Sequence, residues 1–428
     1  MNKRVKNISR FSGLSYQDLL DQESRPVPQS LRESTETYLG SEPLSVDRYL
    51  SREYHEQEKR QLWPKVWQSL CRETEISSAG DFYVHDVAGY SIAVVRTERG
   101  DIHAYPNACL HRGRQLKSGS SAGLGKSRDI TCPFHGFRWS LDGSFQGAPC
   151  EWDFPHIDRS NFDLPALRVD TWGGWVFVNI DGTAPPLREY LGIMVDHFER
   201  WAPEKTYKAL HIKKVLRCNW KIANEAFIES YHTAATHPQL LPYTGDSNSQ
   251  YDCFNDYVSR TITPMGVVSP HVRGTTEEQA VHQWLTVYGV DTEEGLPELP
   301  AGKSAREFLG DMNIRRFSKM YDQDLSSFVT HSEVLDAILY SVFPNFAPWA
   351  GFRPNVTYRF LPYNDSPDMC TMEIMLMMVH MQYQICVELV IMILRMTAYK
   401  IALMNGVAMQ YQICVVLVIM ILRMTAYK

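Results

Sequence analysis

The stretch Cys109-Leu110-His111-Arg112-Gly113 decides how this chain is interpreted, because it places a cysteine two positions before a histidine. Alone, a Cys-x-His pair is weak evidence for a metal site, since a chain with 9 cysteines and 14 histidines contains such pairs by chance. A second pair follows in Cys132-Pro133-Phe134-His135. Residues 112–131 separate the two pairs, so that the whole pattern reads C-x-H-x20-C-x-x-H.

Two cysteines and two histidines in two short loops fit two kinds of metal centre. One is a tetrahedral zinc site. The other is a [2Fe–2S] cluster with two thiolates on one iron and two imidazoles on the other. Zinc sites more often pair cysteine with cysteine or place both histidines on a helix, whereas each loop here mixes one cysteine with one histidine. The pattern therefore favours the cluster, with four candidate ligands: Cys109, His111, Cys132 and His135.

The surrounding sequence predicts a small all-β module. From Asp81 to about Asp181, short β-branched and aromatic runs are broken by glycines, as is typical of short strands joined by turns. Asp142-Gly143, between two apolar runs, predicts a tight hairpin. Upstream, residues 47–67 predict an amphipathic helix that reaches as far as Trp67.

A second motif lies in residues 219–238, NWKIANEAFIESYHTAATHP. Glu225, Glu229 and His232 are spaced at i, i+4 and i+7, which predicts one shared helix face. His237 lies at or beyond the helix end, as Pro238 indicates. Two such histidines and one carboxylate would form the triad of non-haem Fe(II) oxygenases, although the pair alone is more often ordinary surface or core histidine.

The two motifs together resemble one protein family. The paired loops closely resemble the cluster-binding loops of Rieske proteins, and the segment N-W-K…E-x-x-x-E-x-Y-H-x4-H-P accompanies them. Over roughly residues 45–375 the chain is similar to the catalytic α subunit of the Rieske-type non-haem iron oxygenases. That family comprises the aromatic-ring-hydroxylating dioxygenases and related monooxygenases and demethylases.

The resemblance implies an α+β fold, with an all-β Rieske [2Fe–2S] domain followed by a helix-grip catalytic domain of antiparallel sheet and helices. It implies that His232 and His237 bind a mononuclear Fe(II). Glu229 stands where the family has an acidic residue that bridges His232 to His135 of the partner subunit. A carboxylate that accepts from both imidazoles fixes their orientation and gives the electron a short route.

The same resemblance implies the partners. Electrons would come from NAD(P)H through a separate reductase, with or without a ferredoxin, and the chain would form a homotrimer or an α3β3 assembly with a β subunit. The reaction would hydroxylate an organic substrate with O₂, or dealkylate an amine or ether. Aromatic residues within 240–345 favour an apolar or aromatic substrate: Tyr251, Phe254, Tyr257 and Trp284.

The sequence departs from the family at the third iron ligand, which is an aspartate about 150 residues after the second histidine. No aspartate follows Asp368, and Glu388 is a weak candidate in an unlike context. Glu388 lies in a near-duplicated tail, because residues 381–400 and 409–428 differ only at Glu388 and Val416. We attribute this tail to a missing or garbled C-terminal sequence. Two rival functions follow, an electron-transfer protein with a defective iron site and a zinc-binding scaffold.

Composition sets the remaining expectations. A net charge of −6 argues against nucleic-acid binding. Scattered cysteines and the absence of an apolar leader predict a cytoplasmic protein, and no apolar run is long enough to span a membrane. We divide the chain into an N-terminal arm (1–45), the Rieske domain with its leading helix (46–182), the catalytic domain (183–380) and the tail (381–428).

Overall fold

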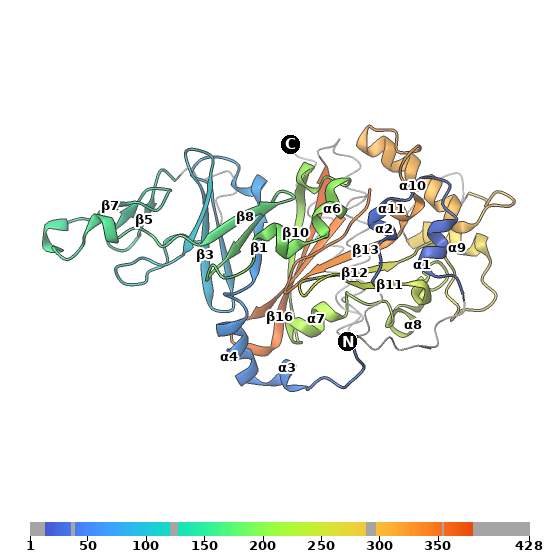
Figure 1. The fold of residues 1–428 in the computed structure, drawn as a ribbon, viewed down its shortest axis with the longest axis horizontal. Coiled ribbons are helices and arrows are strands. Elements are labelled where there is room, and N and C mark those ends of the chain that lie inside the picture. The colour runs from blue at the N-terminus through green and yellow to red at the C-terminus, as the bar shows by residue number, and fades with distance from the viewer. Residues whose placement is uncertain (1–12, 36–38, 120–126, 288–296, 353–354, 380–428) are drawn as a thin grey trace.

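The computed structural model describes residues 13–35, 39–119, 127–287, 297–352 and 355–379. The element order separates two lobes along the long axis of the molecule (Figure 1). One lobe is built almost entirely of strands β1 to β9, and the other combines strands β10 to β16 with most of the helices.

The strand-rich lobe contains three small antiparallel sheets, in the strand orders β1-β9-β8, β2-β3-β4 and β5-β6-β7. Their bounds are Trp67–Arg72 (β1), Phe82–Val87 (β2), Tyr90–Arg96 (β3), Ile102–Pro106 (β4), Ile130–Thr131 (β5), Arg138–Trp139 (β6), Phe145–Gly147 (β7), Arg168–Trp172 (β8) and Trp175–Asn179 (β9). The predicted hairpin at Asp142-Gly143 joins β6 to β7, and Gly143 has a positive φ of 89°. The β5-β6-β7 sheet lies at the far end of this lobe (Figure 1).

The second lobe is built on antiparallel strands in the orders β10-β16-β15-β14 and β11-β12-β13. Their bounds are Thr206–Leu216 (β10), Gln250–Cys253 (β11), Val258–Thr263 (β12), Ala337–Val342 (β13), Ala347–Pro348 (β14), Asn355–Tyr363 (β15) and Ser366–Val379 (β16). Isolated bridges Leu339↔Trp349 and Val342↔Phe346 link the two sheets. The long strands β10 and β16 pair in register from Thr206↔Val379 to Leu216↔Cys370.

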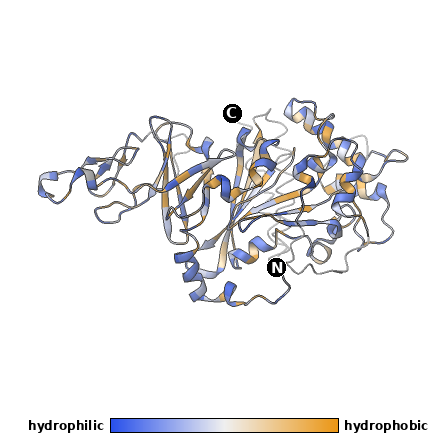
Figure 2. Ribbon diagram, in the orientation of Figure 1, coloured by the Kyte–Doolittle hydropathy of each residue, from blue (hydrophilic) through white to orange (hydrophobic). Residues whose placement is uncertain are grey.

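Helices pack on these sheets. Their bounds are Tyr16–Asp21 (α1), Gln29–Arg32 (α2), Asp47–Leu50 (α3), Arg52–Gln61 (α4), Leu187–Leu191 (α5), Met194–Glu199 (α6), Trp220–Glu225 (α7), Thr233–Thr236 (α8), Glu277–Val287 (α9), Ala305–Tyr321 (α10) and His331–Leu335 (α11). The short 3-10 helices are Glu73–Ile76, Glu151–Asp153, Arg159–Asn161, Pro203–Lys205, Pro238–Leu240 and Asp246–Asn248. Hydrophobic and hydrophilic residues alternate around the helices of this lobe (Figure 2), as helices with one buried face require.

The main hydrophobic core joins α7, α9 and α10 to β15 and β16, with fully buried members such as Ala223, Leu285, Leu309 and Phe360. Tyr16, Leu20 and Leu31, from the polar N-terminal segment, belong to a second core with Tyr340 and Met375. This segment therefore adds its apolar side chains to the core of the second lobe.

Arg359, which forms a buried ion pair in the second lobe, also bonds to β1 of the first lobe. The Arg359 guanidinium on β15 donates to Glu373 Oε2 on β16 at 2.7 Å and to the Leu70 carbonyl on β1 at 2.9 Å. Arg359 and Glu373 are both about 1% exposed. A charge so far from water needs hydrogen bonds to its fixed partners, so this pair fixes how β1 lies against the long strands.

The predicted helix over residues 47–67 is wrong in its extent. The chain forms two helices, α3 and α4, and α4 ends at Gln61. Trp67 is instead the first residue of β1. Pro64 explains the change, because a proline cannot donate the hydrogen bond that would continue a helix.

Among the described residues, no helix is both long enough and apolar enough to cross a membrane.

Candidate metal centres

The first predicted loop folds back on itself after β4. The Cys109 amide donates to the Arg114 carbonyl, and the Gly113 amide donates to the Cys109 carbonyl, each at 2.8 Å. Asn107 closes the loop at its base, since its Nδ2 donates to the Lys117 carbonyl at 2.9 Å and its Oδ1 accepts from the Lys117 amide at 2.9 Å. These bonds hold Cys109 and His111 in a fixed relation.

The second loop repeats this arrangement between β5 and β6. The Cys132 amide donates to the Phe137 carbonyl at 2.8 Å, and the Gly136 amide donates to the Cys132 carbonyl at 3.0 Å. Gly136 has a positive φ of 73°, which a residue without a side chain adopts at little cost. Each loop is therefore a tight turn that starts at its cysteine.

The structure brings the predicted ligands together in two pairs, the two cysteines and the two histidines. Cys109 and Cys132 are 3% and 2% exposed and share one hydrophobic cluster. The rings of His111 and His135 meet edge to face with centroids 4.9 Å apart. Phe137 stacks on His111 at 4.7 Å, so the imidazole is held in one plane.

The pKa shifts of two of these donors differ in direction. Burial raises the pKa of the Cys109 thiol, and the adjoining Cys132 thiol raises it further, so metal binding would have to displace the thiol proton. Burial and the nearby His135 lower the pKa of His111, so this imidazole is neutral and can act as a ligand. The Nδ1 atom of His111 is buried and has no hydrogen-bond partner in the described part of the chain. Such an atom needs a partner, and a metal ion supplies one.

The segment 219–238 differs from its prediction. Helix α7 ends at Glu225, and α8 begins only at Thr233, so Glu225, Glu229 and His232 do not share one helix face. The Glu225 carboxylate instead accepts from the Tyr49 hydroxyl at 3.1 Å. The backbone between the helices turns because side chains from a neighbouring hairpin bond its polar groups, as the Ile228 carbonyl accepts from the Thr261 hydroxyl at 2.6 Å.

This turn nevertheless joins Glu229 to His232. The Glu229 carboxylate accepts from the His232 amide at 3.0 Å, and its other oxygen bonds to His232 Nδ1. Because the carboxylate accepts from an Nδ1–H group, Nε2 of the neutral ring carries the lone pair that can bind a metal. His232 and His237 flank α8, and their ring centroids are 5.2 Å apart.

Glu388, the weak candidate for the third iron ligand, belongs to the near-duplicated tail, which is outside the described residues. Within the described residues, no three or more His, Cys, Asp or Glu side chains gather to hold one metal ion. Two protein ligands per iron are enough for the cluster, because its sulfides complete the coordination. Of the predicted ligands of the mononuclear iron, His232 and His237 lie at the two ends of α8.

Sequence reasoning missed several residues that position these sites. Asn107 could have been noticed, since an asparagine between a strand and a ligand loop commonly bonds nearby backbone groups. Tyr251 was expected only as a pocket aromatic, and Ser230 and Thr261 gave no signal. Their contacts join residues far apart in the sequence, since Ser230 and Tyr251 are 21 positions apart and Ile228 and Thr261 are 33 positions apart.

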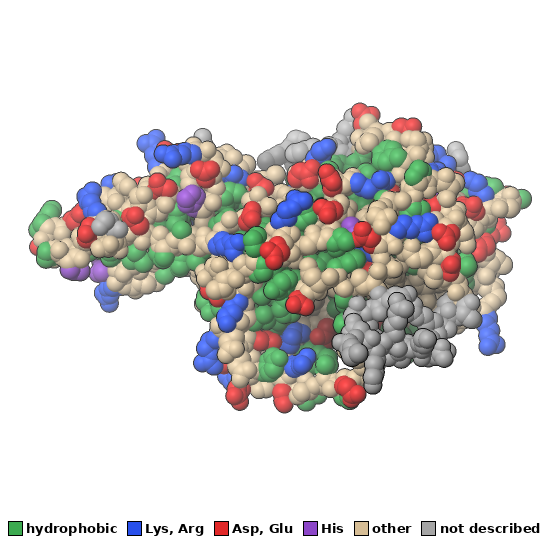
Figure 3. Space-filling model, viewed as in Figure 1, with side chains coloured by type: hydrophobic (Ala, Val, Ile, Leu, Met, Phe, Trp, Pro, Cys, Tyr) green, Lys and Arg blue, Asp and Glu red, His purple; other side chains and the backbone are tan. Residues whose placement is uncertain are grey.

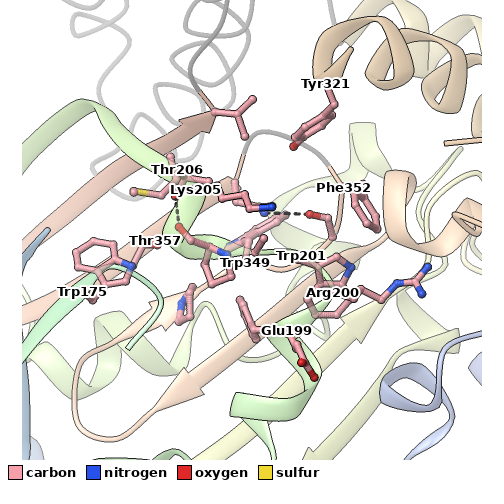
Figure 4. Close-up of a pocket in the computed structure, with 18 of the residues that line it drawn as sticks. Trp175, Glu199, Arg200, Trp201, Lys205, Thr206, Tyr321, Trp349, Phe352 and Thr357 are labelled. Carbon is pink, nitrogen blue, oxygen red and sulfur yellow. Dashed lines mark hydrogen bonds between the residues drawn. The ribbon is translucent and has the colours of Figure 1, made fainter. Parts of the chain in front are cut away.

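Two of the four aromatic residues expected at a substrate pocket serve packing instead, whereas Tyr251 bonds to the turn of Glu229 and His232. Trp284 is 3% exposed and belongs to the main core, and Tyr257 stacks on Tyr190 with centroids 3.9 Å apart. A pocket of about 300 Å³ lies between β9, the end of α6 and strands β14 and β15 (Figure 4). Trp175, Trp201, Trp349 and other residues line this pocket, and none of the predicted metal ligands does.

Comparison with known proteins identifies both lobes. Residues 66–158 match the Rieske [2Fe-2S] domain, and residues 197–385 match the ring-hydroxylating α subunit catalytic domain. The chain is 32% identical over 194 residues to the biphenyl 2,3-dioxygenase α subunit of Rhodococcus jostii, which covers 44% of this chain and 42% of that protein. It is 30% identical over 194 residues to the carnitine monooxygenase oxygenase subunit of Escherichia coli strain K12, covering 44% and 50%. The chain thus spans about half the length of these curated relatives.

Solved structures share the fold. A quaternary ammonium Rieske monooxygenase aligns with a TM-score of 0.61 at 17% identity, covering 84% of this chain and 82% of the other. A naphthalene 1,2-dioxygenase aligns with a TM-score of 0.56 at 20% identity, covering 78% and 71%.

These matches confirm the predicted fold class and the predicted cofactors, a [2Fe–2S] cluster and a mononuclear iron, and they decide against the zinc alternative. The chain belongs to the family of Rieske-type oxygenase α subunits, with a Rieske domain followed by a ring-hydroxylating catalytic domain.

Proposed function

We propose that this chain is the oxygenase component of a Rieske non-haem iron system, in which Cys109, His111, Cys132 and His135 hold the cluster. His232 and His237 hold the mononuclear Fe(II). The observation that carries this proposal is the bond between the Glu229 carboxylate and His232 Nδ1, with the His237 ring 5.2 Å from the His232 ring. A carboxylate that orients a metal-binding imidazole is the usual support of such a site.

The protein's own residues prepare the chemistry. When bound, the cluster supplies single electrons and the iron supplies O₂ activation. Glu229 keeps the proton of His232 on Nδ1. Cys109 and Cys132 are buried, which keeps water away from both sulfur atoms. Phe227, two residues before Glu229, packs on Tyr358 at 4.8 Å and on Phe360 at 5.3 Å, so the start of the turn is anchored in the main core. The similarity to the biphenyl 2,3-dioxygenase α subunit supports hydroxylation of an apolar or aromatic substrate.

The proposal extends to protein partners. In a single chain, apolar side chains around the cluster loops face solvent, with Trp152 80% exposed, Phe134 58% exposed and Leu110 39% exposed. Hydrophobic atoms lie on the surface of this end of the molecule (Figure 3). Such exposure supports a neighbouring subunit in a homotrimer or an α3β3 assembly, and a reductase or ferredoxin that delivers electrons from NAD(P)H. None of the described cysteines forms a disulfide, which supports a cytoplasmic location.

A substrate panel with isotopically labelled O₂ tests the proposal. The purified chain, given a reductase, NADH and biphenyl, should place labelled oxygen in the product. If carnitine is the only substrate that yields a labelled product, the protein is an amine-oxidising monooxygenase. The similarity to the carnitine monooxygenase oxygenase subunit supports this second possibility. Absence of labelled product from every substrate, with both metal centres loaded, would overturn the oxygenase proposal and favour the electron-transfer alternative.

A further inference from the structure

The turn that carries Glu229 and His232 is held by a facing hairpin rather than by its own helix. Tyr251 on β11 and Thr261 on β12 are direct cross-strand partners. Side chains of opposed residues in an antiparallel pair point to the same face of the sheet. Both of these side chains reach the turn, because the Tyr251 hydroxyl accepts from the Ser230 amide at 3.0 Å and the Thr261 hydroxyl donates to the Ile228 carbonyl at 2.6 Å.

Ser230 ties the same turn to the sheet through its side chain. Its Oγ lies 2.7 Å from the Tyr251 hydroxyl, 2.7 Å from Ser249 Oγ and 3.1 Å from the Asp246 carbonyl. Ser249 Oγ is in turn 2.9 Å from Thr263 Oγ1. If the Ser230 hydroxyl donates to the Asp246 carbonyl, its oxygen can accept from both Tyr251 and Ser249. Every hydroxyl proton in the network then has an acceptor.

These hydrogen bonds lie on both sides of Glu229. Ile228 precedes Glu229 and Ser230 follows it, and His232 comes two residues after Ser230. Ser230 is 6% exposed and Thr261 is 8% exposed, so water cannot easily replace the bond from Thr261 to the Ile228 carbonyl or the bond from Ser230 to the Asp246 carbonyl. Tyr251 is 47% exposed. A displacement of the turn would move the Glu229 carboxylate and the His232 ring together, and metal sites tolerate little such movement.

We infer that Tyr251 and Thr261 are positioning residues for the mononuclear iron, acting through the backbone of residues 228–230 to hold Glu229 against His232. This inference rests on the proposed function of His232 and His237. It assigns the hairpin β11–β12 a part in iron binding, although neither hydroxyl contacts a metal ligand directly.

The experiment measures how fast the mononuclear iron leaves the full-length protein in a ferrous chelator. Tyr251→Phe and Thr261→Val each delete one hydroxyl with little change of shape, and each should speed iron loss by about tenfold. Both should also alter the EPR spectrum of the nitric oxide adduct of the ferrous site, while the cluster signal stays unchanged. Thr261→Ser keeps the hydroxyl and should retain iron at the normal rate.

Controls separate this role from general stability. Tyr90→Phe removes a tyrosine hydroxyl from β3 in the other domain and should leave iron release unchanged. Thermal unfolding shows whether a variant has failed to fold. If Tyr251→Phe does not fold, the comparison of iron release between Thr261→Ser and Thr261→Val tests the inference. Equal iron release from wild type, Tyr251→Phe and Thr261→Val would overturn the inference while leaving the proposed function intact. A wild-type protein that takes up no mononuclear iron would overturn both.

Discussion

The Glu229 carboxylate holds His232 twice, by accepting from its backbone amide at 3.0 Å and by bonding to its ring Nδ1. Two bonds to one residue fix both the turn of the chain and the orientation of the imidazole. The His232 side chain is still 29% exposed and that of Glu229 is 36% exposed, so a neighbouring subunit can reach this carboxylate. The relationship therefore fits the bridging role that the family resemblance assigns to Glu229.

Glu229→Gln keeps an oxygen that accepts from His232 Nδ1 and should leave both metal centres loaded. It should lower coupled turnover by about 100-fold, because a neutral amide is a weaker acceptor for a bridge between two imidazoles. Metal content and product formation with NADH and a reductase measure the two effects. Glu225→Gln is the matched control, since Glu225 bonds to Tyr49 and lies outside the turn. Near-normal coupled turnover in Glu229→Gln would rule out the bridging role.

Cys132→Ser should abolish the cluster, because a neutral hydroxyl cannot replace a thiolate ligand at this iron. The loss is read from the EPR spectrum after dithionite reduction and from the acid-labile sulfide content. Cys150→Ser is the control, because Cys150 is exposed and belongs to the same domain. Persistence of the full signal in Cys132→Ser would remove this cysteine from the ligand set.

Gly143→Ala should destabilise the Rieske domain by about 1–3 kcal/mol. Gly143 has a φ of 89°, and an added Cβ would lie 2.8 Å from the Tyr105 ring. Gly100→Ala isolates the backbone effect, since Gly100 has a φ of 91° and no atom within 4 Å of an added Cβ. Denaturant unfolding should therefore show a larger decrease in the free energy of unfolding for Gly143→Ala than for Gly100→Ala. Equal decreases would mean that the contact with Tyr105 does not destabilise the protein.

Glu373→Gln should cost about 3–5 kcal/mol, because it leaves the buried Arg359 guanidinium without its charged partner. Burial by itself raises the pKa of Glu373, but Arg359, His211 and Lys213 overcome this and lower it well below its usual value of 4.5. A lowered pKa in the folded state stabilises the protein above the unfolded value, and this stability is lost as the pH falls.

Wild-type stability should accordingly decline as the pH drops below about 4.5, and Glu373→Gln should decline less steeply over the same range. Chemical unfolding at several pH values checks both statements. Asp365→Asn serves as the control, because Asp365 is exposed and pairs with Lys59 at the surface, where an ion pair contributes little. Parallel pH profiles for wild type and Glu373→Gln would contradict this account of the buried pair.

The cluster loops were predictable because their ligands are close in sequence and each loop is closed by local bonds, such as Cys132 to Phe137. The hairpin at Gly143 was predictable for the same reason. The helix expected through Glu229 was wrong because Thr261 and Tyr251 take up the backbone groups of the turn. Helical spacing carries no information about side chains that arrive from distant strands.

The contacts of the buried pair of Arg359 and Glu373 also could not be predicted from local sequence. Their register on β15 and β16 makes them cross-strand partners, but only the assembled lobes show that Arg359 also bonds to the Leu70 carbonyl. Of the four aromatic residues expected at a substrate pocket, Trp284 is instead part of the main core, because composition alone does not distinguish a pocket wall from core packing.

The repeated tail makes a separate prediction. If residues 381–400 and 409–428 reflect a garbled C-terminal sequence, sequencing of the source gene and intact-mass analysis should give a different C-terminal segment with an acidic residue suited to the third ligand position. Confirmation of the duplicated sequence in the natural protein would contradict this explanation and leave Glu388 as the acidic residue nearest the expected spacing.

The most direct test of the account is the content of iron and acid-labile sulfide per chain in anaerobically purified protein. About three irons and two sulfides per chain are predicted, since the cluster accounts for two irons and both sulfides and His232 and His237 hold the third iron. About two irons with two sulfides would contradict the central claim, because the cluster would then be sound while the turn of Glu229 and His232 holds no metal.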